Sequence, residues 1–385
     1  MKEYLDNLFE LLKPRIMRFF IICSMFLAIV TLQGITDQRE VNQIVFMLSM
    51  ISLFSLFLKN VWVTLFVLWT VFLYSFFKFT SGSEYLSNIF FGSILYLITK
   101  KSFKRENINL FLECFLWFVF INIAYGVIQV LGYDFVFHKV VYDYSGEKEF
   151  FENMNANGFM GHQSIVGYLY ASAIPILATR ESKIAWLGAF LMFIPLVIIK
   201  TSLCFLTGVI GLMFVLYFKI SRKIWIGLVV VGLIFGVVYL KKVDPLGTER
   251  FVQWHQALAD YMKHPITGWG LDSYRNVTPM KDFKYMQTSR KIGGNTLIAY
   301  WDNPHNLIVS LLYEFGIFGL VLFILYMRQN ILRFIPAIKD KNTLALAGFI
   351  LAFVIVSMGH FPIMLARCAA FIIPLFALYE VHTSA

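Results

Sequence analysis

The connection at residues 241–304 combines basic side chains with tryptophans. It holds nine Lys and Arg residues against six Asp and Glu residues, whereas the other long connection, 132–162, holds five acids and two bases. An arginine can bind a phosphate through two parallel N–H groups, and flat aromatic rings can pack on sugar faces. These residue types favour an anionic, sugar-bearing ligand. Composition alone leaves open the alternative that Trp254, Trp269 and Trp301 belong to an aromatic belt at a membrane surface.

Residues 249–262 of this connection are expected to form an amphipathic helix. The stripe at helical spacing consists of Phe251, Trp254, His255, Leu258, Tyr261 and Met262. Such a helix either lies at a membrane interface or caps a helical bundle. Pro265 follows the stripe, and Gly268 and Gly270 predict a turn.

The composition of the chain indicates that the elements which position these residues span a membrane. Of the 385 residues, 59% are hydrophobic and only 15% are charged, whereas a soluble domain is about 45–50% apolar and about 25% charged. This excludes a soluble cytosolic enzyme, a disordered chain, a collagen-like fibre and a disulfide scaffold. All four cysteines lie inside apolar runs, so none is expected in an extracytoplasmic disulfide. The runs are continuous and of helical length, which excludes a β-barrel.

Twelve apolar runs are predicted to be transmembrane helices, since a span needs about 20 residues. They are 16–34, 43–58, 61–78, 87–99, 108–131, 163–179, 184–200, 202–219, 224–240, 306–326, 343–359 and 362–380. The predicted fold class is all-α, a polytopic membrane protein with a large, partly helical extracytoplasmic loop. Residues 1–240 are expected to form a membrane domain of nine helices, 241–304 the loop, and 305–385 a membrane domain of three helices.

Lysine and arginine residues predict the orientation, because cytoplasmic loops accumulate them. With the N-terminus inside, the cytoplasmic segments hold 18 of these residues and the short outer segments hold five. We therefore expect both termini in the cytoplasm and both long connections outside, together with six of the seven histidines. The asymmetry explains most of the net charge of +10, so nucleic acid is not expected as a partner.

An ordered set of motifs spans roughly residues 158–370: ERFVQW from 249, HPITGWGLDSY from 264 and NPHNLIVSLLYEFGIFGL from 303. The set resembles the O-antigen ligase and O-antigen polymerase superfamily, in which an Arg-x-x-x-Trp helix and a Pro-x-x-Gly-x-Gly turn precede a helix-start His and a Glu-x-Gly-x-x-Gly-Leu pattern. The matching residues are Arg250, Trp254, Pro265, Gly268, Gly270, His305, Asn306, Glu314, Gly316, Gly319 and Leu320. Weaker matches are GFMGHQSIVGYLYA from 158 and Ala366–Arg367.

The resemblance implies a glycosyltransferase-C-like enzyme of the bacterial inner membrane with an extracytoplasmic active site. It would transfer a glycan from a polyprenyl (undecaprenyl) diphosphate carrier to an acceptor sugar hydroxyl. His305 would be the base that takes the hydroxyl proton. Arg250 would stabilise the negative charge that develops on the leaving diphosphate. Arg275 and Arg290 are alternates for that contact.

Two ionisable residues lie inside predicted spans, where a charge is costly unless it is paired. Glu314 is the ninth residue of its span, and Arg367 lies about five residues into the last span. Both are expected to face the bundle interior, as an ion pair or through the substrate, and their role is either catalysis or helix packing. The family often carries a Ser-Arg pair on a middle helix, where this chain reads KTSLC at 200–204. Lys200 is the candidate replacement, although lysine lacks the planar fork of arginine.

The remaining candidate substrate-binding residues are Trp254, Trp301, Asn306, His162 and Gln163. No metal and no cofactor are expected, because hard cations need several oxygen ligands and the chain has no Asp-x-Asp pair. The expected partners are the diphosphate-linked glycan donor, membrane lipid, and an acceptor that is either lipid A–core or a second lipid-linked glycan.

Three alternatives remain open. A ligase and a polymerase share the motifs and differ in the acceptor; the short spacing between the His motif and the Glu-x-Gly pattern favours a ligase. A different membrane glycosyltransferase would use Asp37 or Glu40 in the first outer loop as its base. A lipid-glycan flippase or transporter is the third alternative, which the lack of a repeat or of paired broken helices disfavours.

Overall fold

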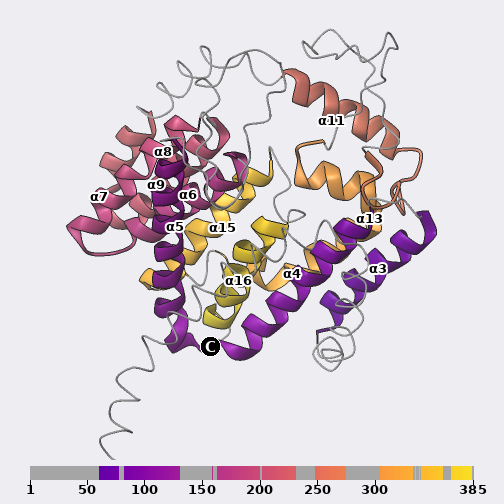
Figure 1. Ribbon diagram of the computed structural model, residues 1–385, viewed down its shortest axis with the longest axis horizontal. Coiled ribbons are helices and arrows are strands. Elements are labelled where there is room, and N and C mark those ends of the chain that lie inside the picture. Colours follow the sequence, from indigo (N-terminus) through magenta and orange to yellow (C-terminus); the bar gives the residue numbers. More distant parts are fainter. Residues whose placement is uncertain are drawn as a thin grey trace, which may run out of the picture.

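The computed structural model consists of helices joined by turns, without a strand among the residues that it describes (Figure 1). These residues are 60–77, 82–130, 158, 163–199, 202–230, 248–274, 304–332, 334, 338, 340–358 and 366–383. The predicted all-α class is confirmed for this part of the chain. The predicted helices 16–34 and 43–58 lie outside it.

Most predicted spans within the described ranges coincide with a helix. The elements are α3 (Val61–Phe77), α4 (Gly82–Ser102), the 3-10 turn η1 (Arg105–Asn107), α5 (Ile108–Val130), α6 (Gln163–Ala178), α7 (Lys183–Leu191), α8 (Phe193–Ile198), α9 (Ser202–Lys219), α11 (Thr248–Tyr261), α13 (Leu307–Tyr326), α14 (Arg328–Leu332), α15 (Lys341–Ser357) and α16 (Ala366–Thr383). Residues 222–230 are also helical. Helix α4 is longer than the predicted segment 87–99.

The predicted span 184–200 coincides with two consecutive short helices, α7 and α8, that meet at Met192. Pro195 explains the interruption. A proline has no N–H to donate to the carbonyl four residues earlier, here that of Leu191, and its ring crowds that carbonyl. Met192 itself has helical backbone angles, and Lys183–Ile198 forms one apolar helical stretch, so the predicted helix is confirmed in this range.

Helix α6 lies at the centre of a group formed with α9 and α15. Small residues let these backbones approach, since a Cβ at Gly348 would lie 2.6 Å from Pro175 and one at Gly208 would lie 2.6 Å from Ile174. Close packing through glycine is common between membrane helices, where dispersion contacts take the place of hydrophobic burial. A second group, α3, α4, α13 and α16, joins the first through α15 and α16.

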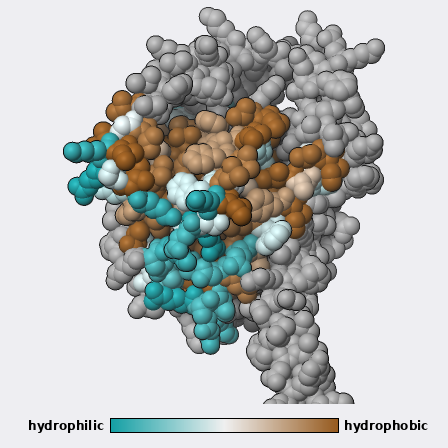
Figure 2. Space-filling view, turned by 90° about the vertical axis from the view of Figure 1, so that its left-hand side faces the viewer, coloured by the Kyte–Doolittle hydropathy of each residue, from teal (hydrophilic) through white to brown (hydrophobic). Residues whose placement is uncertain are grey.

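The outward surfaces of α5, α7 and α8 carry large apolar side chains. Ile184, Leu187, Phe190 and Trp117 are all more than half exposed. Figure 2 shows this face of the molecule as a broad apolar area, with hydrophilic residues gathered at one end. Contiguous apolar surface of this extent is unusual on a soluble monomer.

Two of the described helices are long and apolar enough to cross a membrane, judged by length and composition: Arg105–Gln129 and Leu307–Tyr326. Shorter apolar helices, such as Val61–Phe77 and Lys341–Ser357, lie beside them.

Candidate functional site

Helix α13 occupies the predicted span 306–326, but its backbone is broken at Gly316. This residue has φ 69° and ψ −177°, which are not helical values. The carbonyls of Tyr313, Glu314 and Phe315 would accept from residues 317–319 in a continuous helix, so after the break they need other donors. The prediction of a continuous helix here was wrong.

The missing donors come from the turn at 264–270 and from α3. The bonds are Trp269 N–H to the Tyr313 carbonyl oxygen (2.8 Å), Gly270 N–H to that of Glu314 (3.0 Å), and the Trp69 indole N–H to that of Phe315 (3.0 Å). In the other direction, the Ile317 N–H donates to the Pro265 carbonyl oxygen (2.9 Å). The turn therefore replaces the bonds that α13 lacks. We call residues 264–270 and 313–317 together the clasp.

Two glycines permit this close approach. Gly268 has φ +68°, and a Cβ there would lie 2.6 Å from backbone atoms of Tyr313, Glu314 and Gly316. A Cβ on Gly316 would in turn meet the backbone of Ile266. Both positions need a left-handed φ and the absence of a side chain. The Pro-x-x-Gly-x-Gly and Glu-x-Gly patterns are thus the two sides of one contact.

Helix α11, predicted at 249–262, packs on α13. The Trp254 indole N–H donates to the carbonyl oxygen of Pro304 (2.7 Å), the residue just before His305. Arg250 lies one helical turn before Trp254, and residues four apart share a helix face. The fold therefore brings the helix that carries Arg250 to the chain segment that carries His305.

His305 and Asn306 form the start of α13. His305 is half-buried and has φ 49°, a conformation that costs a non-glycine residue about 1–3 kcal/mol and that gathers at functional sites. The Asn306 side-chain oxygen accepts from the N–H groups of Ile308 (3.0 Å) and Val309 (3.1 Å), and its amide donates to the Met358 carbonyl oxygen (3.1 Å). Asn306 thus holds the helix start that presents His305.

Glu314 is buried, with 3% of its surface exposed, as predicted for a residue facing the bundle interior. It lies about 10 Å along the axis from the first residue of α13, at a rise of about 1.5 Å per residue, and its carbonyl is part of the clasp. Arg367 is the second described residue of α16.

The buried side of α11 is largely polar. Gln253, Gln256 and Asp260 are buried there together with Ala257. Next to this side, the Tyr274 hydroxyl donates to the Gln253 carbonyl oxygen (3.4 Å), and burial raises the pKa of that hydroxyl. No sequence motif predicts a role for these residues, because single glutamines among apolar residues form no recognisable pattern. Polar side chains buried beside α13 are suited to binding sugar hydroxyls.

Other predicted site residues are described only in part or not at all. Those outside the described residues are His162, Lys200, Arg275, Arg290, Trp301 and Asp37. The backbones of Arg250, Gln163 and Arg367 are helical, and nothing more of them is described. The described ranges contain no group of three His, Cys, Asp or Glu residues that could hold a metal ion.

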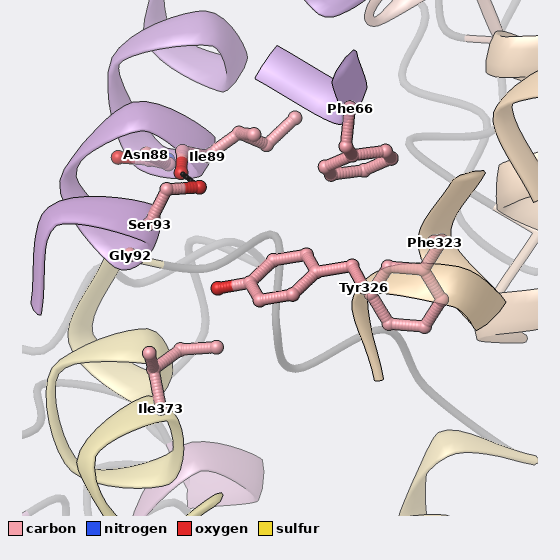
Figure 3. Close-up of a pocket in the computed structure, with 8 residues that line it drawn as sticks. All are labelled: Phe66, Asn88, Ile89, Gly92, Ser93, Phe323, Tyr326 and Ile373. Carbon is pink, nitrogen blue, oxygen red and sulfur yellow. Dashed lines mark hydrogen bonds between the residues drawn. The ribbon is translucent and has the colours of Figure 1, made fainter. Parts of the chain in front are cut away.

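A cavity between α3, α4, α13 and α16 is lined by Phe66, Asn88, Ile89, Gly92, Ser93, Phe323, Tyr326 and Ile373 (Figure 3). Its volume of about 20 Å³ corresponds to roughly one water molecule. It is therefore too small for a glycan.

Comparisons with known proteins agree with the motifs. Residues 169–324 match the model of a family described as "O-Antigen ligase". A protein of Rickettsia conorii (strain ATCC VR-613 / Malish 7), named "Putative polysaccharide ligase", is 28% identical over 201 residues, 46% of this chain and 45% of that protein. This chain thus covers less than half of that relative's length. The resemblance expected from the motifs is confirmed: residues 169–324, which contain α11, the clasp and His305, are similar to the O-antigen ligase family.

Proposed function

We propose that this protein transfers a glycan from a polyprenyl (undecaprenyl) diphosphate carrier to an acceptor sugar hydroxyl at the periplasmic face of the inner membrane. His305 is the general base, and Arg250 binds the diphosphate. The acceptor of first choice is lipid A–core, which makes the reaction an O-antigen ligation. The reaction needs no metal ion.

The observation that carries the proposal is the hydrogen bond between Trp254 and Pro304 (2.7 Å). It joins the helix of Arg250 to the segment of His305, although the two are far apart in the sequence. A base and a cation carried by these two neighbouring segments would match the two needs of the reaction, which are removal of the hydroxyl proton and stabilisation of the diphosphate. The strained φ of His305 is a second sign of a functional position.

The chemical step balances without a co-reactant. The acceptor hydroxyl oxygen forms a bond to the anomeric carbon of the glycan while its proton passes to the His305 imidazole. The bond from that carbon to the diphosphate oxygen breaks, and the polyprenyl diphosphate leaves with the electron pair. Arg250, with Arg275 and Arg290 as alternates, lowers the energy of the charge that develops there.

The proposed topology is twelve transmembrane helices with both termini in the cytoplasm. Residues 1–240 and 305–385 lie in the membrane, and 241–304 forms the outer catalytic loop. Basic residues support this placement, because the ends of α4 and α6 and the start of α7 carry Lys100, Arg180 and Lys183. The exposed apolar side chains of α5, α7 and α8 suit contact with lipid tails.

Further contacts with the glycan and its carrier are proposed for Trp254, Trp301, His162, Gln163, Asn306, Lys200 and Arg367. Glu314 completes the catalytic set, through its charge or by fixing the geometry of α13. The buried glutamines Gln253 and Gln256 extend the same surface.

The structure bears on the flippase alternative in one respect. A broken membrane helix occurs in many transporters, where it lines a substrate cavity. At Gly316 the freed backbone groups are instead bonded to the turn at 264–270 and to Trp69. This use of the break favours an enzyme.

The test is a transfer assay with the full chain in lipid nanodiscs, polyprenyl-diphosphate-linked glycan as donor, and lipid A–core or a second carrier-linked glycan as acceptor. We expect glycosylated lipid A–core as the product. Addition of EDTA should leave the rate of its formation unchanged. Product only on the carrier-linked acceptor would identify a polymerase. Absence of product on both acceptors would reject the proposal, and movement of the donor across a vesicle bilayer would then favour the flippase.

A further inference from the structure

Helix α11 has its polar side turned toward the protein and its apolar side turned outward. Gln253, Gln256 and Asp260 are buried, whereas Leu258 and Met262 are exposed, Met262 by 68%. A helix on the surface of a soluble protein shows the opposite arrangement, because burial of apolar area is what holds it in place. The outward apolar side of α11 therefore requires an apolar contact of its own.

The exposed apolar surface continues from α11 into the turn that follows it. Ile266, in the clasp, is 66% exposed. We call Leu258, Met262 and Ile266 the outer apolar edge.

The edge adjoins the exposed apolar sides of α13 and α3. The Pro265 carbonyl, next to Ile266, accepts from the N–H of Ile317, and Ile317 and Phe318 are both exposed on α13. On the other side, a Cβ at Gly270 would lie 2.6 Å from the ring of Phe77, the last residue of α3. The exposed apolar side of α13 and the end of α3 thus lie close to the outer apolar edge.

We propose that α11 docks on the outer leaflet of the bilayer through the outer apolar edge, as an interfacial helix. The inference rests on the proposed membrane location of α3 and α13. It adds a contact between lipid and the loop that contains α11. Its polar side faces inward to the candidate site, and its apolar side enters the region between headgroups and acyl chains. This arrangement sets the helix of Arg250 at the depth where the diphosphate of a lipid carrier lies.

The charged residue at the end of α11 also suits contact with a lipid bilayer. Lys263 pairs with Asp260 (2.7 Å), yet 62% of its side chain is exposed. A lysine stem can lie along apolar surface while its ammonium group reaches lipid phosphates. His264, also exposed, follows it and packs edge-on against the Trp269 ring at 4.1 Å between centroids. A tryptophan at this level is typical of the membrane interface.

The experiment measures depth with nitroxide labels on the full chain in phospholipid nanodiscs. Single cysteines replace Met262 or Ile266 in a background whose four native cysteines are alanine. Phe318→Cys, on the exposed side of α13, calibrates the membrane interior, and Lys183→Cys, at the charged start of α7, calibrates water. The readout is the ratio of collisions with oxygen, which is enriched in lipid, to collisions with a water-soluble nickel complex.

We expect the labels at 262 and 266 to give ratios near that of Phe318→Cys and well above that of Lys183→Cys. Ratios equal to that of Lys183→Cys, while Phe318→Cys reports lipid, would overturn the docking of α11 and leave the membrane location intact. A water-like ratio at Phe318→Cys would instead reject the membrane location itself. Shielding of both labels from both reagents would show that a protein surface covers the edge, which also overturns the proposal.

Discussion

The two ends of the helical bundle are held together by different interactions. At the end that holds the C-terminal parts of α4 and α16, ionisable side chains join separate elements: Lys100 pairs with Glu380, Arg105 pairs with Asp340 (3.5 Å), and the His382 ring is hydrogen-bonded to Asp340 (2.8 Å). At the end that holds α11 and the clasp, backbone and indole N–H groups make the connections. The ion pair described there, Lys263 with Asp260, lies within one short segment.

This difference suits the two ends to different tasks. Ion pairs between helices fix the charged end. Neutral hydrogen bonds fix the end with the clasp, so within the described residues no ion pair between elements competes there with an anionic ligand. A frame held by hydrogen bonds can position cationic side chains for a diphosphate. The comparison predicts that changes at the clasp end alter transfer, whereas changes at the charged end alter only stability.

The largest effect is expected for Gly268→Ala. Gly268 has φ +68°, and a Cβ there would lie 2.6 Å from three backbone atoms. The clasp must therefore open, at a cost of about 3 kcal/mol or more in the free energy of unfolding. Thermal unfolding in detergent and the transfer assay measure the loss. The control is Gly227→Ala, where a Cβ would have open space. Equal stability of the two variants would contradict the account of the clasp.

At the charged end, Lys100→Met should lower the free energy of unfolding by about 2 kcal/mol. The substitution leaves the buried carboxylate of Glu380 without that cation, and the penalty is below that of a fully buried pair because Lys100 is partly exposed. The exposed neighbour Lys101→Met serves as the control. Transfer per folded molecule should match the wild type in both variants, and a large loss of transfer in Lys100→Met would break the proposed separation of tasks.

Trp254→Phe should separate positioning from stability. It removes the hydrogen bond to the Pro304 carbonyl (2.7 Å) and keeps an aromatic ring. We expect a loss of about 1 kcal/mol in stability and of about tenfold or more in transfer, since small displacements of reacting groups are costly. Trp225→Phe removes a similar bond, to the Met213 carbonyl (2.8 Å), away from the site. Trp225→Phe should lower stability and leave transfer unchanged. An equal drop in transfer for both variants would refute a specific role for Trp254.

The smallest effect is a pH dependence at the charged end. Burial alone would raise the pKa of the Asp340 carboxyl, but hydrogen bonds from the Thr343 backbone and from His382, together with the nearby His382 charge, lower it below 3.8. A lowered pKa means that this stabilisation is present above pH 3.8 and is lost as the pH falls through the folded-state value. Thermal unfolding between about pH 6 and pH 3 measures it. Asp340→Asn can still cap α15 but should lack this pH-dependent stabilisation. If the melting temperatures of the wild type and of Asp340→Asn fell equally with pH, the role of Asp340 would be contradicted.

Helices such as α5 and α15 were predictable because they are continuous apolar runs bounded by charged or turn residues. The division at Met192 was also readable, because Pro195 marks it. The break at Gly316 was not, since apolar residues continue on both sides and the compensating donors come from a turn distant in the sequence. Asn306 as a helix cap could have been recognised from its residue type at a helix start.

The orientation of α11 shows a limit of a different kind. The spacing of Leu258 and Met262 reveals an apolar side, but a pattern cannot tell whether that side meets protein or lipid. Likewise, the candidate roles of Arg250 and His305 came from the family resemblance. The hydrogen bond from Trp254 to Pro304 added the physical link between them, which no spacing in the sequence contains.

The most direct test of the central claim is the transfer rate of His305→Gln beside that of His255→Gln, with bound donor measured in parallel. His255 is exposed on the outward side of α11. Loss of a general base costs about 10²- to 10⁴-fold, so we predict at least a hundredfold drop for His305→Gln with donor binding retained, and an unchanged rate for His255→Gln. Equal rates for the two variants would contradict the role of His305.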